Sequence, residues 1–226
     1  MKPQKIKLFC FGFGQVAMNF VKTIFSEGLN LEFNVTSRKD SHTFKFNNQS
    51  YNSYFLDNYK FDKALLKKLE SADYILISIP PVNKEDIVIK NFSTFINGCK
   101  WITYLSATSV YGNHNGKWVN ENSKLKGKSK FGLGRKIVEK SWIKFRNLNN
   151  VDVNILRVSG IYSKENNVLK KISKKNIYVK EKKYFSRIRI EDLAQIIKRV
   201  FYTQQSSLIL NASDDKPATN IEVANF

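Results

Sequence analysis

The sequence predicts a doubly wound α/β fold, in which helices cover both faces of a parallel sheet. A buried strand runs directly into a glycine turn and a helix at residues 7–17. Continuous apolar runs recur at 74–79 and 101–105, as expected of strands that are buried on both faces. Stretches with helical spacing separate these runs, which is typical of repeated strand–helix units. The 226 residues suffice for one full α/β domain and a small appendage.

The first strand ends in the pattern G-x-G-x-x-A. Gly12 lets the chain turn sharply, and Gly14 lacks a side chain, so a pyrophosphate can approach the backbone. Ala17 is small where the helix must lie close to the strand. The backbone N–H groups of Gln15 and Val16 open the helix without intrahelical partners and favour an anion. The pattern is a version of the dinucleotide-binding fingerprint, although a tight turn without a ligand would use the same glycines.

The second predicted strand, residues 31–35, leads into Ser37, Arg38 and Lys39. NAD-binding chains carry an acid at this place, about 20 residues past the glycines, where it binds the ribose 2′-hydroxyl. Here no acid is present, and the three side chains could hold a 2′-phosphate instead, Arg38 in a bidentate manner. The sequence therefore predicts NADP(H) in preference to NAD(H). The alternative is a solvated turn.

The next segments continue the alternation of strands and helices. Residues 41–60 predict a hairpin or short strand that ends near Asp57, and Asp62 is suited to cap a helix through Leu69. The buried strand at 72–79 ends abruptly at Pro80.

Because the carboxyl end of that strand should lie beside the glycine turn, we expect Ile79 and Pro80 to lie over the cofactor. A further helix is expected to begin at Asn83, with Asp86 in its first turn, and to end at Gly98.

Four segments resemble the extended short-chain dehydrogenases/reductases, the NAD-dependent epimerase/dehydratase group. The strand end LSATSVYG at 105–112 resembles that of the family, and FGLGRKIVE at 131–139 resembles its Tyr-Gly-x-Ser-Lys-x-x-x-Glu helix. Residues 153–162 resemble the next strand and the loop over the nicotinamide, and 185–194 resemble a later arginine-to-alanine segment. The order and spacing match over nearly the whole chain.

The resemblance implies two parts: an NAD(P)-binding Rossmann domain over residues 1–160, and a smaller substrate-side region over residues 161–226 that covers the cleft. It also implies that the cofactor contacts a set of residues beyond the glycine turn. These are Ser106, Ala107, Arg135, Val158 and Ser159.

The three side chains that do the chemistry in this family are replaced here. Position by position, the proton-exchanging Tyr becomes Phe131, the Lys becomes Arg135, and the Ser or Thr becomes Ala107. Phe131 has no proton to exchange, so it cannot supply general acid–base catalysis. Arg135 keeps a positive charge and can still hold ribose hydroxyls. In these departures the chain resembles an atypical subset of the family that also lacks the Tyr.

Composition limits the partners. A formal net charge of +19 attracts anions, and because the basic residues are scattered, an anionic substrate or cofactor is favoured over nucleic acid.

Two isolated cysteines and two isolated histidines give no metal site. No apolar run is long enough for a membrane span, and the chain enters its first strand almost at once, so we expect no signal peptide and a cytoplasmic protein. We also consider a homodimer.

These observations lead to two main hypotheses. The first is an NADP(H)-dependent oxidoreductase or epimerase-like enzyme that acts on a small or nucleotide-linked carbonyl or sugar substrate. Its proton donor would be Thr108 or a water held by Arg135. The second is an NADP(H)-binding regulator or partner subunit without turnover. A basic nucleic-acid binder on the same scaffold is a weaker third reading.

Overall fold

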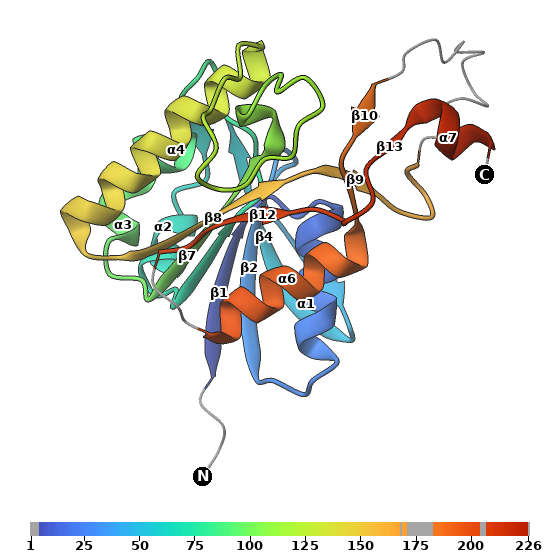
Figure 1. The fold of residues 1–226 in the computed structure, drawn as a ribbon. Coiled ribbons are helices and arrows are strands. Elements are labelled where there is room, and N and C mark those ends of the chain that lie inside the picture. Colours follow the sequence, from blue (N-terminus) through green and yellow to red (C-terminus); the bar gives the residue numbers. More distant parts are fainter. Residues whose placement is uncertain (1–4, 168, 171–182, 204–206, 226) are drawn as a thin grey trace.

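A twisted sheet forms the centre of the computed structural model, which describes residues 5–167, 169–170, 183–203 and 207–225. Within the described residues the sheet has nine strands (Figure 1). In sheet order these are β12 (Ile209–Ala212), β8 (Asp152–Val158), β7 (Trp101–Ala107), β6 (Tyr74–Ile77), β1 (Ile6–Phe11), β2 (Leu31–Ser37), β4 (Gln49–Asp57) and β3 (His42–Phe46), with β5 (Lys60–Phe61) beside β4.

The order of the parallel strands reverses at β1. From β1 the chain first proceeds outward through β2 to β4, and then returns to the other side of β1 as β6, β7, β8 and β12. Among the described strands of this sheet, only β3 and β5 run antiparallel, each paired to β4. This is the predicted doubly wound arrangement, and it leaves a topological switch point between the carboxyl ends of β1 and β6.

Helices cover both faces of the sheet, as Figure 1 shows. On one face lie α1 (Gln15–Phe25) and α6 (Ile190–Thr203), and on the other lie α2 (Leu65–Glu70), α3 (Ile87–Ile96) and α4 (Lys130–Asn149). In α1 the buried residues follow helical spacing, and Phe20 packs edge-on against Phe201 of α6 at 5.9 Å between ring centroids. Each face therefore buries its own apolar cluster against the sheet.

The start of α3 corrects one prediction. The helix begins at Ile87, and Asp86 is its N-cap, whose carboxylate accepts from the backbone N–H groups of Val88 and Ile89. Asn83 and Lys84 instead occupy the left-handed region, at φ 50° and 67°, in a tight turn before the helix. Asp86 also accepts from the indole N–H of Trp142 at 3.1 Å, which ties α3 to α4.

The elements after residue 160 divide between the main layers and the carboxyl edge of the sheet. The helix α6 packs on α1, and β12 pairs with β8. Beyond the carboxyl ends of the central strands lie β9 (Gly160–Tyr162) paired with β11 (Arg187–Arg189), β10 (Tyr184–Phe185) paired with β13 (Ala218–Thr219), and α7 (Asn220–Asn225) (Figure 1). The division of the chain at residue 160 stays a prediction.

Candidate functional site

A cavity of about 510 Å³ lies at the switch point, where β1, β2, β4 and β6 end. Its walls are the glycine turn, the end of β2 with the residue after it, the end of β4 with the residue after it, and the segment after β6. The lining residues are Gly12, Phe13, Gly14, Thr36, Ser37, Arg38, Leu56, Asp57, Asn58, Ser78, Ile79, Pro80, Val82 and Ile87. Six of the predicted cofactor-binding residues belong to this lining: Gly12, Gly14, Ser37, Arg38, Ile79 and Pro80. Ile79 and Pro80, at the predicted strand end, form one wall.

Gly12 is fixed from both sides. Its φ of +86° is a conformation that glycine adopts without strain, and a Cβ here would lie 2.8 Å from Ile79 Cγ2. The Gly12 N–H donates to Thr36 Oγ1 at 2.9 Å, and the Ser78 hydroxyl donates to the Phe11 carbonyl at 3.0 Å. The turn is therefore held by one side chain from β2 and another from the end of β6.

Gly14 faces open space. A Cβ at this position would meet no atom within 4 Å, apart from its chain neighbours. Gly14 is the N-cap of α1, no side chain caps the helix there, and the helical hydrogen bonds begin when Met18 N–H donates to the Gly14 carbonyl. The N–H groups of Gln15 and Val16 consequently point out of the helix without intrahelical partners, and the positive end of the helix dipole faces the same space. This arrangement fits a phosphate group.

The rim of the cavity carries one cation. Ser37 and Arg38 line it, whereas Lys39 follows them outside the lining. Arg38 is exposed and forms no ion pair with any described residue. The Ser37 hydroxyl accepts from Ser53 at 3.1 Å, which keeps it at the mouth of the cavity.

Several residues that line the cavity cannot be recognised from the sequence alone. Thr36 looks like an ordinary strand residue, and its partner, the N–H of Gly12, lies 24 positions away. The sequence predicts Asp57 only as the end of a strand, and it assigns no role to Asn58. In the structure they bring a carboxylate and an amide to the wall of the cavity, beyond the parallel pairing of β4 with β2.

The remaining predicted residues lie further along the same carboxyl edge, outside the cavity lining. Ala107 and Val158 are register partners at the ends of β7 and β8. Thr108 opens a short 3₁₀ helix, η1 (Thr108–Val110), and its hydroxyl makes no hydrogen bond within the described residues. Ser159 is buried, and its hydroxyl also has no hydrogen-bond partner in the described part of the chain. Two hydroxyl groups are thus free at this edge.

Arg135 and Phe131 lie one turn apart on α4. The Arg135 guanidinium donates through Nη1 to the Leu105 carbonyl at 2.6 Å and reaches the Tyr104 hydroxyl at 3.4 Å. Burial raises the pKa of Tyr104, so that hydroxyl stays protonated. Phe131 is 77% exposed, with no core packing to explain an aromatic side chain at this position.

The structure gives Ser106 a partner within the protein. Its hydroxyl donates to Glu139 Oε1 at 2.5 Å, and Glu139 pairs with Arg157 at 2.9 Å in a site where both side chains are at most 5% exposed. Arg157 also donates to the Tyr111 hydroxyl, which donates in turn to Asn211 Oδ1 at 2.7 Å. Ser106 therefore belongs to a buried network that joins β7, α4, β8 and β12, and its proton is not free for a cofactor.

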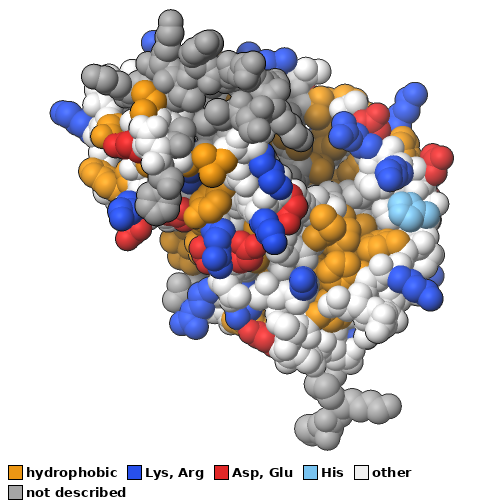
Figure 2. Space-filling model, turned by 90° about the vertical axis from the view of Figure 1, so that its right-hand side faces the viewer, with side chains coloured by type: hydrophobic (Ala, Val, Ile, Leu, Met, Phe, Trp, Pro, Cys, Tyr) orange, Lys and Arg blue, Asp and Glu red, His pale blue; other side chains and the backbone are white. Residues whose placement is uncertain are grey.

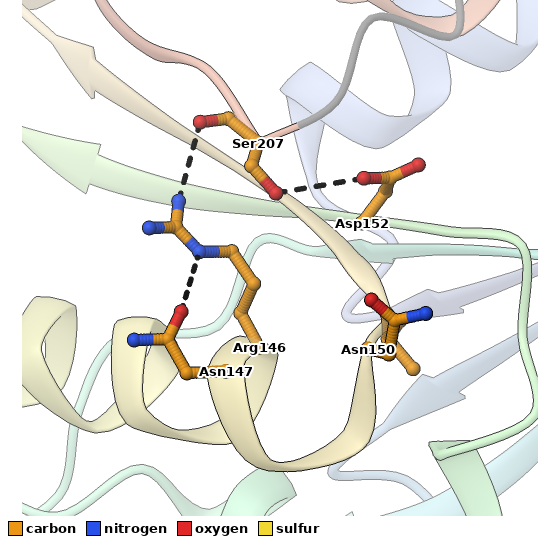
Figure 3. A pocket seen from close by; sticks show the side chains of 6 residues that line it. Arg146, Asn147, Asn150, Asp152 and Ser207 are labelled. Atoms are coloured by element: carbon orange, nitrogen blue, oxygen red, sulfur yellow. Dashed lines mark hydrogen bonds between the residues drawn. The ribbon is translucent and has the colours of Figure 1, made fainter.

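A second hollow, of about 540 Å³, lies at the opposite end of the sheet (Figure 3). The Arg146 guanidinium donates to the Ser207 carbonyl at 3.2 Å there, and the Ser207 hydroxyl lies 3.5 Å from Asp152. Its polar groups are occupied by one another, and it holds none of the predicted residues. Among the described residues no group of three or more His, Cys, Asp or Glu could hold a metal, and no helix has the length and apolar character to cross a membrane.

No protein-family model matches the sequence, and neither does any curated protein. Many solved structures share its fold. A functionally unknown conserved protein from Silicibacter pomeroyi is similar with a TM-score of 0.79 at 24% identity, over 96% of this chain and 75% of that one. The UDP-glucuronic acid 4-epimerase from Bacillus cereus, in complex with NAD, gives a TM-score of 0.78 at 14% identity, over 97% and 81% of the two chains. The UDP-N-acetylglucosamine 4-epimerase from Bacillus cereus gives 0.77 at 16% identity, over 97% and 79%. The chain therefore has the Rossmann-type fold of the epimerase/dehydratase structures.

Proposed function

We propose that this chain is an NAD(P)-binding oxidoreductase of the epimerase/dehydratase type. One observation carries the proposal: the free N–H groups of α1 face open space at Gly14, beside a cavity at the topological switch point. Parallel α/β sheets bind dinucleotides at this place. Similar structures include an epimerase solved with NAD, which supports the same assignment.

The chain's own residues would hold the dinucleotide along the carboxyl edge. Gly12 and Gly14 allow the pyrophosphate to approach, and Gln15 and Val16 donate their backbone N–H groups to it. Asp57 offers a carboxylate that can accept from an amino group on the base. Bound NADP(H) supplies hydride transfer.

A preference for NADP(H) over NAD(H) rests on Arg38 and Ser37. Arg38 lines the cavity without a carboxylate partner in the described residues, so its guanidinium is available for a 2′-phosphate. A planar guanidinium binds such a phosphate with two parallel hydrogen bonds. Lys39 adds a positive charge just outside the lining.

The substrate would lie further along the edge, near Thr108, Arg135 and Ser159. The free Thr108 hydroxyl can hold a substrate oxygen, and Arg135 can hold a water molecule or a ribose hydroxyl with the N–H groups that Leu105 does not use. Nucleotide-linked sugars are the substrate class we infer, because similar structures include a UDP-N-acetylglucosamine 4-epimerase and a complex with UDP-glucose and NAD. Their negative charge suits a protein with a net charge of +19.

The second candidate function is an NADP(H)-binding regulator or partner subunit without turnover. Exposed Phe131 favours it, because no hydroxyl stands at the position where the family carries its proton-exchanging Tyr. To separate the two, we would incubate the protein with NADP⁺ and UDP-glucose, UDP-glucuronic acid or UDP-N-acetylglucosamine, and follow the products by NMR. An epimer or dehydrated sugar that is absent with the Thr108→Val variant supports the enzyme. Cofactor binding without any product supports the regulator.

A further inference from the structure

We propose that the loop and helix from Asn113 to Asn150 form a docking surface for single-stranded nucleic acid. This segment carries ten Lys and Arg residues but only two of the 19 acidic residues of the chain. The segment, which is the loop after η1 together with α4, therefore carries a net charge of +8 in 38 residues, against +19 for the whole chain of 226. The segment includes Arg135 and Phe131 of the proposed substrate edge, but the inference rests on charge and exposure and does not depend on cofactor binding.

Both acidic residues of the segment are turned inward. Glu139 is buried and paired with Arg157. Glu121 accepts the backbone N–H of Asn211 at 2.7 Å, and its own carbonyl accepts from Arg157 at 3.0 Å. Neither carboxylate neutralises the lysines outside, and in the described parts of the chain none of these lysines forms an ion pair.

On the opposite side of the molecule, basic and acidic side chains are mixed. Figure 2 views the molecule from the side facing away from α4, and there acidic side chains lie among the basic ones. Ion pairs such as Lys198 with Glu27 and Arg189 with Glu191 belong to α6 and the strand before it. Among the described residues, an anionic polymer would therefore meet less opposing charge at the loop and α4 than around α6.

Three lysines of the loop alternate with less exposed residues. Lys124, Lys126 and Lys128 are exposed, whereas Leu125 is half-buried and Gly127 is buried. The backbone of this stretch is anchored, because the N–H groups of Lys126 and Gly127 donate to the carbonyls of Tyr111 and Val110. The chain that carries these lysines is thus fixed to η1 and the residue after it.

An exposed aromatic residue lies on either side of these three lysines in the sequence. Trp118 follows Lys117, and Phe131 follows Lys130; both rings are 77% exposed, the largest fractions among the large hydrophobic residues described. Cationic grooves with exposed aromatic rings bind single strands, because bases stack on the rings while lysines meet the phosphates.

The same charge disfavours a second copy of this chain as the occupant. A two-fold contact through α4 would place Lys136, Lys140 and Lys144 of one copy against the same residues of the other, with no exposed carboxylate between them. An anionic membrane is the remaining competitor, and the experiment includes it.

The test is fluorescence anisotropy of a labelled 15-nucleotide oligouridine, titrated with the full chain at several salt concentrations. Five phosphate contacts, from Lys117, Lys124, Lys126, Lys128 and Lys130, predict a log–log salt slope of about −3.5, or roughly a hundredfold loss of affinity from 50 to 200 mM salt.

Two pairs of variants distinguish binding at this surface from an effect of net charge and from nonspecific hydrophobic binding. The triple variant Lys124→Gln, Lys126→Gln, Lys128→Gln should reduce the magnitude of the slope by about 2. Its matched control removes three exposed, unpaired lysines elsewhere and should change the slope far less: Lys60→Gln, Lys63→Gln, Lys67→Gln.

Trp118→Ala should weaken binding at least fivefold, whereas Leu148→Ala, a 73% exposed apolar residue near the other end of α4, should not. The proposal is overturned if oligouridine does not bind at 50 mM salt, or if both triple variants act alike. It is equally overturned if the protein sediments with phosphatidylserine vesicles while oligouridine does not bind.

Discussion

Gly14→Val separates the binding role of the glycine turn from its structural role. The added side chain would occupy the space in front of the α1 N–H groups, which is where we place the pyrophosphate. Two charge-assisted hydrogen bonds would be lost, each contributing about 1.5–3 kcal/mol. The affinity for the dinucleotide should therefore fall more than a hundredfold.

The fold should tolerate this change. Gly14 has a φ of −82° and a ψ of −173°, which any residue adopts, and its Cβ would meet nothing within 4 Å. Replacing the N-cap residue by valine should cost at most about 1 kcal/mol of stability. Gly12→Ala provides the contrast, because its φ of +86° and the contacts of 2.8 and 2.9 Å with Ile79 and Ser78 make even a methyl group costly. The left-handed conformation alone should cost about 1–2 kcal/mol.

The assay combines urea unfolding with calorimetric titration of each variant. The expected pattern is a Gly14→Val protein that folds with nearly wild-type stability and does not bind, and a Gly12→Ala protein that is clearly less stable. Gly14→Val with unchanged dinucleotide affinity would refute the placement of the phosphate. A large loss of stability in Gly14→Val would instead show that the space at this glycine is needed by the protein itself.

Three further predictions follow from single contacts. Arg38→Ala should weaken NADPH binding about ten- to a hundredfold and leave NADH unchanged, since it removes charge-assisted hydrogen bonds to the 2′-phosphate alone; equal losses in titrations of both would show that Arg38 does not read this group. Glu139→Gln should lower the free energy of unfolding by about 3–5 kcal/mol in urea, because it leaves the Arg157 charge buried without a counterion; a loss below 1 kcal/mol would contradict a tight pair. The ammonium of Lys5 holds the pKa of Glu32 down to about 2, so this carboxylate contributes stability that is fully present above about pH 4.5 and is lost as the pH falls towards 2. Glu32→Gln should flatten the dependence of stability on pH in that window, and an unchanged acid profile would be evidence against this contribution.

Local patterns were sufficient to predict the layers of the fold. The glycine turn and the buried strands β6 and β7 depend on neighbours within a few residues. The same holds for the T-x-x-E spacing at 219–222, which predicts a capping box for a helix, here α7. In that box Thr219 N–H donates to Glu222, and Glu222 N–H donates back to Thr219, as the T-x-x-E spacing predicts. The start of α3 was misplaced, because Asn83 is also a good N-cap residue, and only the tertiary contact with Trp142 distinguishes Asp86.

The sequence predicts only part of the candidate site, because the walls of the cavity come from strands that are distant in sequence. Thr36 and Asp57 lie at the ends of β2 and β4, and Ser78 follows β6; no local pattern shows that these strand ends meet around one cavity. The sequence also could not show that Glu139 takes the proton of Ser106, since those residues lie 33 positions apart. The sequence also contains a basic run from Lys170 to Lys183, which predicts a solvated helix face bordering the cleft; residues 171–182 of it lie outside the described residues.

The most direct test of the central claim is calorimetric titration of the purified protein with NADPH and, separately, with NADH. The account predicts micromolar binding of NADPH and weaker binding of NADH, both lost in Gly14→Val. If neither dinucleotide binds a folded wild-type protein, the glycine turn serves only the fold, and both the enzyme and the regulator proposals are wrong.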